Sequence, residues 1–391
     1  PLSQAIRQGH SASPETLAQR FVKGAVETPE QALAGACDIV AESLAEHQVI
    51  REIARELLWR QGTLTARAAS KELDPRFQDY AQFESRLRGL PSHRVLALLR
   101  GATEKALRLK IDLDTAHFMR RASHYLRIAQ VPRRTPAWET YLSSSLEDAW
   151  KRLLRPALET EILGELKNTA DEEAIRVFSR NVEALLMAAP YGMRSVMAFD
   201  PGLRTGIKCV MLSETGALQD TWVLHELRHK AEAERLFLEK LKKYNPSAIA
   251  IGDGTGGREA ELAVKTWLQT AGLAAPPLVV RVSETGASIY SASEIAREEF
   301  PDLDLTYRGA VSIGRRLQDP LAELVKIPPR SLGVGQYQHD VNARALQTQL
   351  EQSVESCVNR VGVELNTASV PLLKYVSGLN QKVAENIVAY R

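Results

Sequence analysis

Hydrophobic and polar residues follow two different periods along this chain, and the period changes near residue 190. Before that point apolar residues recur every three or four positions. One such stripe, within residues 46–61, comprises Val49, Ile50, Ile53, Leu57 and Leu58. This spacing is typical of amphipathic helices. The pattern therefore predicts an almost wholly helical region over residues 1–190, ending at a Pro-Tyr-Gly boundary.

Two places in this helical region suggest contact with nucleic acid. The helix over 46–61 is followed by Gly62 and by a segment, from Thr63, that we also expect to be helical. This arrangement suits either a helix-turn-helix DNA reader or plain helix packing. The densest basic stretch surrounds His124 and Tyr125 and contains Arg120, Arg121, Arg127, Arg133 and Arg134. Cations among aromatic rings suit nucleic acid, but arginines on a helix and its following loop are also commonly solvated.

From Ser195 the pattern becomes one of short apolar runs separated by turns, which is typical of β-strands. The predicted strands are Val196–Phe199, Gly206–Leu212, Thr221–Leu224, Ala248–Ile251 and Leu278–Val282. Short turns join the first three, which predicts antiparallel pairing, whereas intervening helices predict that the last two are parallel additions. We therefore expect a mixed five-stranded sheet with flanking helices over residues 191–330, and helices again over 331–391.

Three carboxylates stand where the predicted strands and helices could gather them at one end of this sheet. Asp200 ends the first strand, Glu284 follows the fifth, and Asp319 lies on or between later helices. Folds of the ribonuclease H type place their first metal-binding aspartate where Asp200 stands. Such carboxylates can bind Mg²⁺ or Mn²⁺ for phosphodiester cleavage. Alternatives remain, because Asp253 competes with Glu284, and Asp319 before Pro320 would also serve as a helix cap.

Two further motifs suggest phosphate binding. The loop Gly252-Asp-Gly-Thr-Gly-Gly257 leads into a helix and could cradle a phosphate, as in actin-like and sugar-kinase phosphotransferases, although it does not match a P-loop. Val376-Ser-Gly-Leu-Asn380 joins two short helices like the turn of a helix-hairpin-helix, which points backbone N–H groups at a phosphate. We expect Asn380 to replace the usual second glycine because asparagine tolerates left-handed backbone. An ordinary helical hairpin is the alternative.

Composition narrows the class of protein. In 391 residues, 44% are hydrophobic and 25% charged, as in ordinary globular proteins. The net charge is only +2, from 50 basic and 48 acidic residues, so a nucleic-acid surface must be a local patch. Cys37, Cys209 and Cys357 are far apart, as expected of free thiols in a reducing compartment. No apolar run approaches a membrane span. The chain lacks an initiator Met and stops inside a helical pattern, which suggests a fragment.

Several segments, in their order along the chain, resemble the Tex family of bacterial transcription accessory proteins. Asp200-Pro-Gly-Leu-Arg-Thr-Gly206 resembles the start of the YqgF/RuvC-like domain of that family. The other matching segments are Pro91–Arg94, Ser145–Leu154, Ser283–Glu294, Arg308–Glu323, Gly333–Asn342 and Val363–Ser369. The resemblance covers most of the chain and is weakest around residues 103–140.

The resemblance implies a multidomain α and α/β protein: a helical N-terminal region, a ribonuclease-H-like domain and the start of a helix-hairpin-helix domain. It implies that a further N-terminal piece and a C-terminal OB-fold RNA-binding domain are missing. By motif, the RuvC-like acidic positions fall on Asp200, Glu284 and Asp319. Because the family's domain is not regarded as a demonstrated nuclease, the motif does not by itself make this chain an enzyme.

The sequence thus supports three hypotheses. The first is a cytoplasmic, monomeric factor that binds RNA or DNA without sequence preference, associates with RNA polymerase and requires no cofactor. Its expected phosphate contacts are Ser377, Gly378, Leu379, Asn380, Arg204, Arg315 and Arg316. The second is a metal-dependent nuclease that uses the three carboxylates as catalytic residues and metal ligands. The third is a phosphotransferase that uses the glycine-rich loop.

Overall fold

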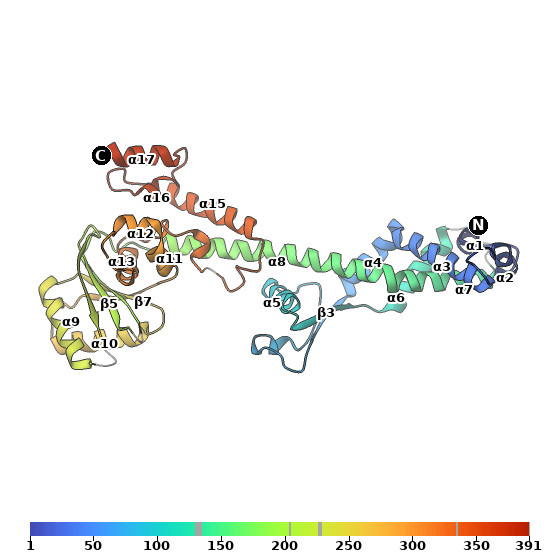
Figure 1. The fold of residues 1–391 in the computed structure, drawn as a ribbon, viewed down its shortest axis with the longest axis horizontal. Helices are drawn as coiled ribbons and strands as arrows, with labels where there is room; N and C mark the ends of the chain where they lie inside the picture. The colour runs from blue at the N-terminus through green and yellow to red at the C-terminus, as the bar shows by residue number, and fades with distance from the viewer. Residues whose placement is uncertain (130–134, 203–204, 226–228, 334, 391) are drawn as a thin grey trace. The chain divides into compact units, whose positions relative to one another are not determined.

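The computed structural model describes residues 1–129, 135–202, 205–225, 229–333 and 335–390 (Figure 1). The chain folds into two compact units, Pro1–Glu173 and Ala174–Arg391. The division falls inside the long helix α8 (Arg155–Leu186), so each unit includes part of that helix.

The first unit is mainly helical, as its 3.6-residue periodicity predicts. Helix α3, for example, begins where the side chain of Thr28 accepts a hydrogen bond from the N–H of Gln31, with proline at its first position. Besides α8, its helices are α1 (Leu2–Gln8), α2 (Pro14–Ala18), α3 (Pro29–Glu46), α4 (Gln48–Gln61), α5 (Ser92–Thr103), α6 (Thr115–Ala129) and α7 (Pro136–Asp148). Shorter helical turns are η1 (Gln19–Phe21), η2 (Pro75–Tyr80) and η3 (Ala149–Leu154).

The first unit also contains a three-stranded antiparallel sheet, which corrects the prediction of an almost wholly helical region. Its strands are β1 (Thr63–Ala68), β2 (Gln82–Arg86) and β3 (Leu107–Asp112), in the order β2-β1-β3. The segment after Gly62 is therefore a strand, so residues 46–69 do not form a helix-turn-helix. The residues of β1 pair with partners 15 to 49 positions away, and this pairing overrides the helical tendency of the alanines and the arginine in β1.

The second unit is built on the predicted five-stranded mixed sheet. Its strands are β4 (Val196–Asp200), β5 (Ile207–Leu212), β6 (Leu218–Leu224), β7 (Ala248–Gly252) and β8 (Leu278–Val282), in the order β6-β5-β4-β7-β8. The first three pair antiparallel, and β7 and β8 add in parallel. This ribonuclease-H-like arrangement confirms the predicted fold class, including the position of β7 beside β4.

Successive side chains of the central strands point to opposite faces of this sheet, and each face has its own hydrophobic core. Met197 and Phe199 face α9 (Lys230–Tyr244) and α10 (Gly257–Ala271), where they pack with residues such as Phe237. Val196 and Ala198 face α13 (Leu305–Gln318) on the other side. Figure 1 shows α9 and α10 on one side of the strands and α13 on the other. Helix α13 thus runs along β4, from Gly309 beside Asp200 to Gln318 near the start of the strand.

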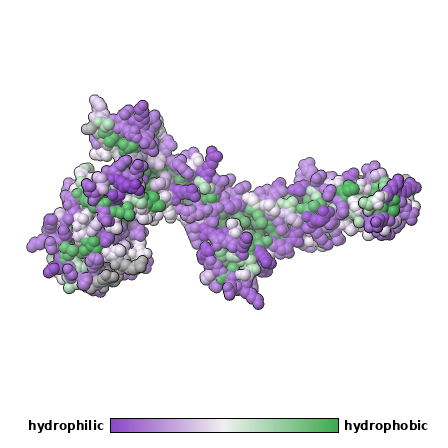
Figure 2. Space-filling model, in the orientation of Figure 1, coloured by the Kyte–Doolittle hydropathy of each residue, from purple (hydrophilic) through white to green (hydrophobic). Residues whose placement is uncertain are grey.

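The remaining helices of the second unit follow the sheet or cover α13. They are α11 (Ala287–Ala292), α12 (Glu294–Glu299), α14 (Pro320–Leu324), η4 (Pro329–Ser331), α15 (Ala343–Val361), α16 (Val370–Leu373) and α17 (Gln381–Tyr390). Helices α16 and α17 form the predicted helix-hairpin-helix at the C-terminal end. On the face drawn in Figure 2, hydrophilic residues cover most of the surface and hydrophobic ones form small patches. No helix among the described residues is both long and apolar enough to cross a membrane.

Candidate functional site

Asp200 is placed by the strand that precedes it. Residues Val196 to Phe199 are fully buried, so the strand exits the core at the aspartate. On the neighbouring antiparallel strand Lys208 lies directly opposite Asp200. The carboxylate is therefore held at the carboxyl end of the central strand, with one cation beside it.

Glu284 approaches the same end of the sheet from the loop after β8. Its backbone N–H donates to Oδ1 of Asp253 at 3.0 Å, and the N–H of Asp253 donates in turn to the carbonyl of Val282 at 3.0 Å. Its side chain lies over the turn after β7, where a Cβ on Gly254 would sit 1.5 Å from Oε1 of Glu284. Asp253, the competing acid, therefore fixes the backbone of Glu284, while Glu284 itself faces the site.

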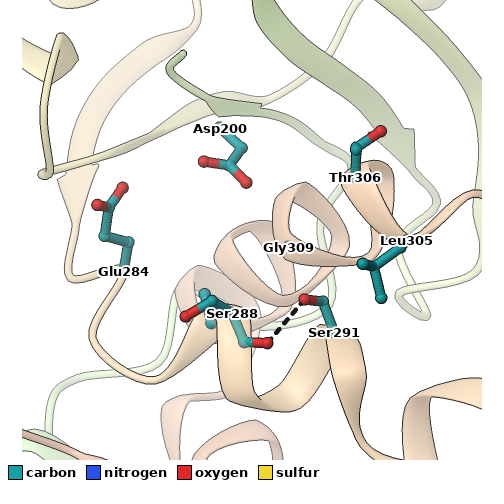
Figure 3. A pocket seen from close by; sticks show the side chains of 8 residues that line it. Asp200, Glu284, Ser288, Ser291, Leu305, Thr306 and Gly309 are labelled. Carbon is teal, nitrogen blue, oxygen red and sulfur yellow. Dashed lines mark hydrogen bonds between the residues drawn. The ribbon is translucent and has the colours of Figure 1, made fainter. Parts of the chain in front are cut away.

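Asp200 and Glu284 line one pocket of about 200 Å³. Figure 3 shows both carboxylates projecting into this space, above α11 and beside the first turns of α13. The rest of the lining is small or polar and comprises Ala287, Ser288, Ser291, Leu305, Thr306 and Gly309. Within the lining, the hydroxyl of Ser291 donates to the carbonyl of Ser288 at 2.9 Å. The sequence motif at Asp200 and Glu284 thus corresponds to a real concavity.

The electrostatics of the pocket disfavour a charged Asp200. Burial raises the pKa of this carboxyl to about 6, the negative charge of Glu284 adds to the rise, and Lys208 opposes it. A cation or hydrogen-bond donor that enters the pocket would stabilise the charged carboxylate of Asp200 and so lower its pKa.

Asp319 does not join the other two carboxylates, which corrects the expectation that all three gather at one end of the sheet. It is the N-cap of α14, where its Oδ1 accepts from the N–H of Ala322 at 3.0 Å. The preceding Gln318 donates to the carbonyls of Arg194 and Ser213, at the opposite end of β4 from Asp200. Gly309 lies beside Asp200, whereas Asp319 follows the last residue of α13. Because the helix rises about 1.5 Å per residue between them, Asp319 lies far from Asp200. The capping interpretation of Asp319 accounts for its position.

The place on α13 that faces Asp200 belongs to Gly309 instead of an acid. A Cβ on Gly309 would lie 2.6 Å from Oδ2 of Asp200. Across the residues that the structure describes, no group of three or more His, Cys, Asp or Glu side chains is arranged to hold a metal ion. The pair Asp200 and Glu284 could supply two ligands to one hydrated Mg²⁺. It does not fit the predicted site in which three carboxylates hold the catalytic metal.

The glycines of the loop 252–257 are required by close packing within the protein. Gly254 makes room for the Glu284 carboxylate, and a Cβ on Gly257 would lie 2.3 Å from the carbonyl oxygen of Gly252. A phosphate in this loop would also face the charge of Glu284. These contacts favour the structural explanation of the loop and disfavour a phosphotransferase.

The predicted phosphate-binding arginines of α13 are engaged inside the second unit. Arg316 is 4% exposed, and its Nη1 donates to the carbonyls of Ser283 and Thr285, on either side of Glu284. Arg315 donates to the carbonyl of Gly216 and pairs with Glu299 at 2.5 Å. Both positions are corrected: Arg316 holds the loop that carries Glu284, and Arg315 stabilises the fold. Arg204 lies outside the described residues.

The turn of the helix-hairpin-helix is exposed and is tied to α15. The side chain of Asn359 accepts from the N–H of Ser377 at 3.0 Å and donates to the carbonyl of Tyr375 at 3.0 Å. Gly378 has φ 85°, which only glycine adopts easily. Asn380 is not left-handed, contrary to the explanation offered from the sequence; it caps α17 by accepting from the N–H of Val383 at 3.0 Å.

The sequence interpretation missed the small and polar residues that line the pocket and the residue that holds the hairpin turn in place. Gly309, Ser288 and Thr306 line the pocket, and Asn359 holds the hairpin turn. Glycine, serine and threonine carry no charge pattern to mark them. Asn359 lies 18 residues before Ser377, and no local motif connects the two.

Comparison with protein families accounts for most of the chain. Residues 9–178 match the model described as Tex central region-like, and residues 194–318 match that of the Tex protein YqgF-like domain. Residues 358–391 match the helix-hairpin-helix motif. The three matches follow one another in the order that the resemblance predicts.

Known proteins show the same similarity over the whole length. The chain is 42% identical to Protein tex of Bordetella pertussis, with 100% of the chain and 51% of that protein covered. It is 42% identical to Transcriptional accessory protein Tex of Neisseria gonorrhoeae, covering 100% of the chain and 52% of the relative. With the human S1 RNA-binding domain-containing protein 1 it shares 37% identity, over 95% of the chain and 38% of that protein. The chain spans about half the length of the bacterial relatives.

Proposed function

Because this chain belongs to the Tex family, we propose that it is a transcription accessory factor that binds nucleic acid without reading base sequence. One relative is named a transcriptional accessory protein and another an S1 RNA-binding domain-containing protein, which supports this class of function. RNA polymerase is the protein partner that we propose on the same basis. A pull-down of purified polymerase by this chain tests that partnership. Failure of the two proteins to associate at low salt would contradict it.

The observation that carries the proposal is the helix-hairpin-helix turn. Ser377, Gly378 and Asn380 are exposed. Within the described part of the chain, the N–H groups of Gly378 and Asn380 have no hydrogen-bond partner. The turn precedes the N-terminus of α17, where the helix dipole favours an anion. Lys382, in the first turn of α17, is exposed and adds a positive charge. These features suit a phosphate, whose recognition carries no base information.

We further propose that the ribonuclease-H-like domain serves as a binding platform and does not cut nucleic acid. The supporting observation is Gly309 at the α13 position that faces Asp200, together with the remote position of Asp319. Asp200 and Glu284 alone leave the three-carboxylate set of a metal-dependent nuclease incomplete.

Fluorescence anisotropy with labelled RNA and DNA oligonucleotides of unrelated sequence tests the binding proposal. We expect similar affinities across sequences and a steep loss of affinity with salt, because phosphate contacts release counterions. Lys382→Ala should weaken binding and reduce the salt dependence, whereas Lys242→Ala, an exposed lysine on α9 in the same unit, should not. Equal effects of the two substitutions would show that the hairpin is not the site.

An incubation of the same oligonucleotides with Mg²⁺ or Mn²⁺ tests the second proposal. We expect no cleavage above that of the Asp200→Asn variant. Metal-dependent cleavage that disappears in Asp200→Asn would overturn the platform proposal and restore the nuclease hypothesis.

A further inference from the structure

Helix α6, in the first unit, carries two different faces. Phe118, Ala122 and Leu126 recur every four residues and are buried, with Phe118 stacked on Trp150 at 4.4 Å between ring centroids. A second stripe at spacings of three and four residues consists of His117, Arg120, Arg121, His124 and Tyr125. One side of the helix is thus fixed in the core, and the other presents cations and aromatic rings.

This second stripe lines a groove of about 470 Å³ together with Ile53 of the neighbouring helix α4. We call it the α6 groove. No carboxylate is among its lining residues. Arg120 also borders a second hollow of about 480 Å³, which reaches Trp150 and Lys151. That second hollow is also lined by Glu147, which pairs with Lys151 at 3.5 Å. The two hollows share Arg120, so a chain molecule in the α6 groove could reach the second hollow past this arginine.

The two arginines of the groove are available to an anion. Arg120 is exposed, and among the described residues it has no hydrogen-bond or ion-pair partner. Arg121 approaches Glu56 at 3.3 Å, with side chains 44% and 37% exposed. An exposed pair of this kind is worth little, so a phosphate can replace the glutamate at small cost.

The rings of the groove are suited to bases. Tyr125 is partly exposed, and its ring makes a T-shaped contact with that of His47, with 5.5 Å between centroids and 65° between planes. A T-shaped contact occupies at most one face of the tyrosine ring, and Tyr125 lines the groove with part of its surface exposed, so a ring face remains for stacking. His124, one residue earlier, is exposed beside it. Arginine beside aromatic rings is the combination that binds single-stranded nucleic acid, because unpaired bases can stack while the backbone meets cations.

We propose that the α6 groove binds a single-stranded segment of nucleic acid, with Arg120 and Arg121 at phosphates and Tyr125 stacked on a base. The inference rests on the proposed nucleic-acid function but assigns a site separate from the helix-hairpin-helix. Phosphates and ring stacking occur in both RNA and DNA, so oligouridine and oligothymidine should both bind. A duplex should bind more weakly because its bases are paired and stacked internally.

Binding of labelled single strands to the full chain tests this site by anisotropy titration over a range of salt. For R120A/R121A we expect at least tenfold weaker binding, and a plot of log K against log salt that is less steep by about 1.4, or about 0.7 for each lost phosphate contact. Tyr125→Ala should weaken binding about tenfold through lost stacking. Tyr125→Phe should bind as the parent does, because it keeps the ring.

The matched control is R127A/R152A, which removes the same charge from the same unit. Arg127 and Arg152 are exposed, each pairs with an acidic residue, and neither lines the α6 groove. We expect no change in its affinity or salt dependence. Circular dichroism of every variant separates lost binding from lost folding.

Four outcomes overturn the proposal: groove variants that bind like the parent, a control that weakens equally, a duplex that binds as tightly as the single strand, or a charge effect without a Tyr125 effect. The last, with displacement by polyglutamate at matched charge, would identify an acidic protein as the occupant.

Combining R120A/R121A with Lys382→Ala distinguishes the two sites. If only the hairpin proposal fails, the groove variants still lose affinity; if only the groove proposal fails, Lys382→Ala alone still weakens binding.

Discussion

Gly309 and Asp200 are fitted to one another across the edge of the sheet. A Cβ on Gly309 would lie 2.6 Å from Oδ2 of Asp200, closer than carbon and oxygen can approach. Because Gly309 has no side chain, the Asp200 carboxylate can point into its pocket. This relationship explains why the helix contributes shape to the site and no third carboxylate.

The first prediction concerns the energetic coupling of these two residues. Gly309→Ala should destabilise the parent protein, because the Asp200 carboxylate must move from its place. In an Asp200→Ala background the same change should instead stabilise α13, since alanine is the better helix former by about 1 kcal/mol. We expect a coupling of about 1–2 kcal/mol, within the range for residues in contact.

Denaturant unfolding of the parent, the two single variants and the double variant measures this coupling. Gly35→Ala on α3 is the control, because its added Cβ meets no atom within 4 Å apart from its chain neighbours and the backbone of its own helix turns. It should stabilise the chain in both backgrounds alike. A coupling near zero would show that the aspartate does not depend on the glycine.

The second prediction follows from the pKa of Asp200, which burial and then Glu284 raise from 3.8 to about 6. Between these two values the folded protein binds more protons than the unfolded chain, so this carboxyl lowers stability as pH rises through that range. Asp200→Asn should therefore stabilise the protein above pH 6, by at most about 3 kcal/mol at 1.36 kcal/mol per pKa unit. The gain should vanish below about pH 4, where both side chains are neutral.

Denaturation at several pH values in the presence of EDTA checks this prediction. Asp220→Asn on β6 is a control of opposite sign. Burial raises the pKa of Asp220, but hydrogen bonds from Lys240, Tyr244 and the N–H of Thr221 outweigh burial and lower it overall. Its substitution should cost stability above its ordinary pKa. A loss of stability in Asp200→Asn at pH 7 would contradict the raised pKa.

The sheet of the second unit was predictable because its local pattern and its tertiary pairing agree. Each predicted strand of that sheet is present; the short turns indicated the antiparallel pairings, and the intervening helices indicated the parallel ones. The sheet of the first unit was missed although Leu107-Arg-Leu-Lys-Ile-Asp112 alternates strictly between apolar and polar residues. Its partner Thr63–Ala68 contains alanine, leucine and arginine, whose helical preference concealed the central strand.

The candidate site was predictable only where the type of a single residue and its immediate neighbours indicate the chemistry. A carboxylate at the end of a buried strand marked Asp200, and the turn after the last strand marked Glu284. The position of Asp319 depends on how α13 runs along the sheet, and the role of Gly309 depends on what faces it. Arg316 shows the same limit, because a buried arginine and a phosphate-binding arginine look alike in sequence. Three-dimensional packing decides each of these cases.

The third prediction distinguishes a capping role for Asp319 from a metal-binding one. Asp319→Ala removes the acceptor for the N–H of Ala322 and should cost about 1 kcal/mol in unfolding free energy. Asp319→Asn keeps a good N-cap and should cost almost nothing. A metal ligand would show a different pattern, since asparagine removes the negative charge. Loss of divalent-ion stabilisation in Asp319→Asn, measured by thermal unfolding with and without Mg²⁺, would therefore contradict the capping role.

The last prediction concerns Asn380, which ends the hairpin turn and begins α17. Its Oδ1 accepts from the N–H of Val383, so Asn380→Ala should fray the first turn of α17 and cost about 0.5–2 kcal/mol. Asn380→Gly should cost only a few tenths, because glycine is a tolerable N-cap. If the turn binds phosphate through backbone N–H groups, the glycine variant should bind nucleic acid as the parent does and the alanine variant more weakly. Hydrogen exchange of the α17 amides measures the fraying, and anisotropy measures the binding. An alanine variant that frays α17 yet binds with full affinity would show that phosphate is held elsewhere.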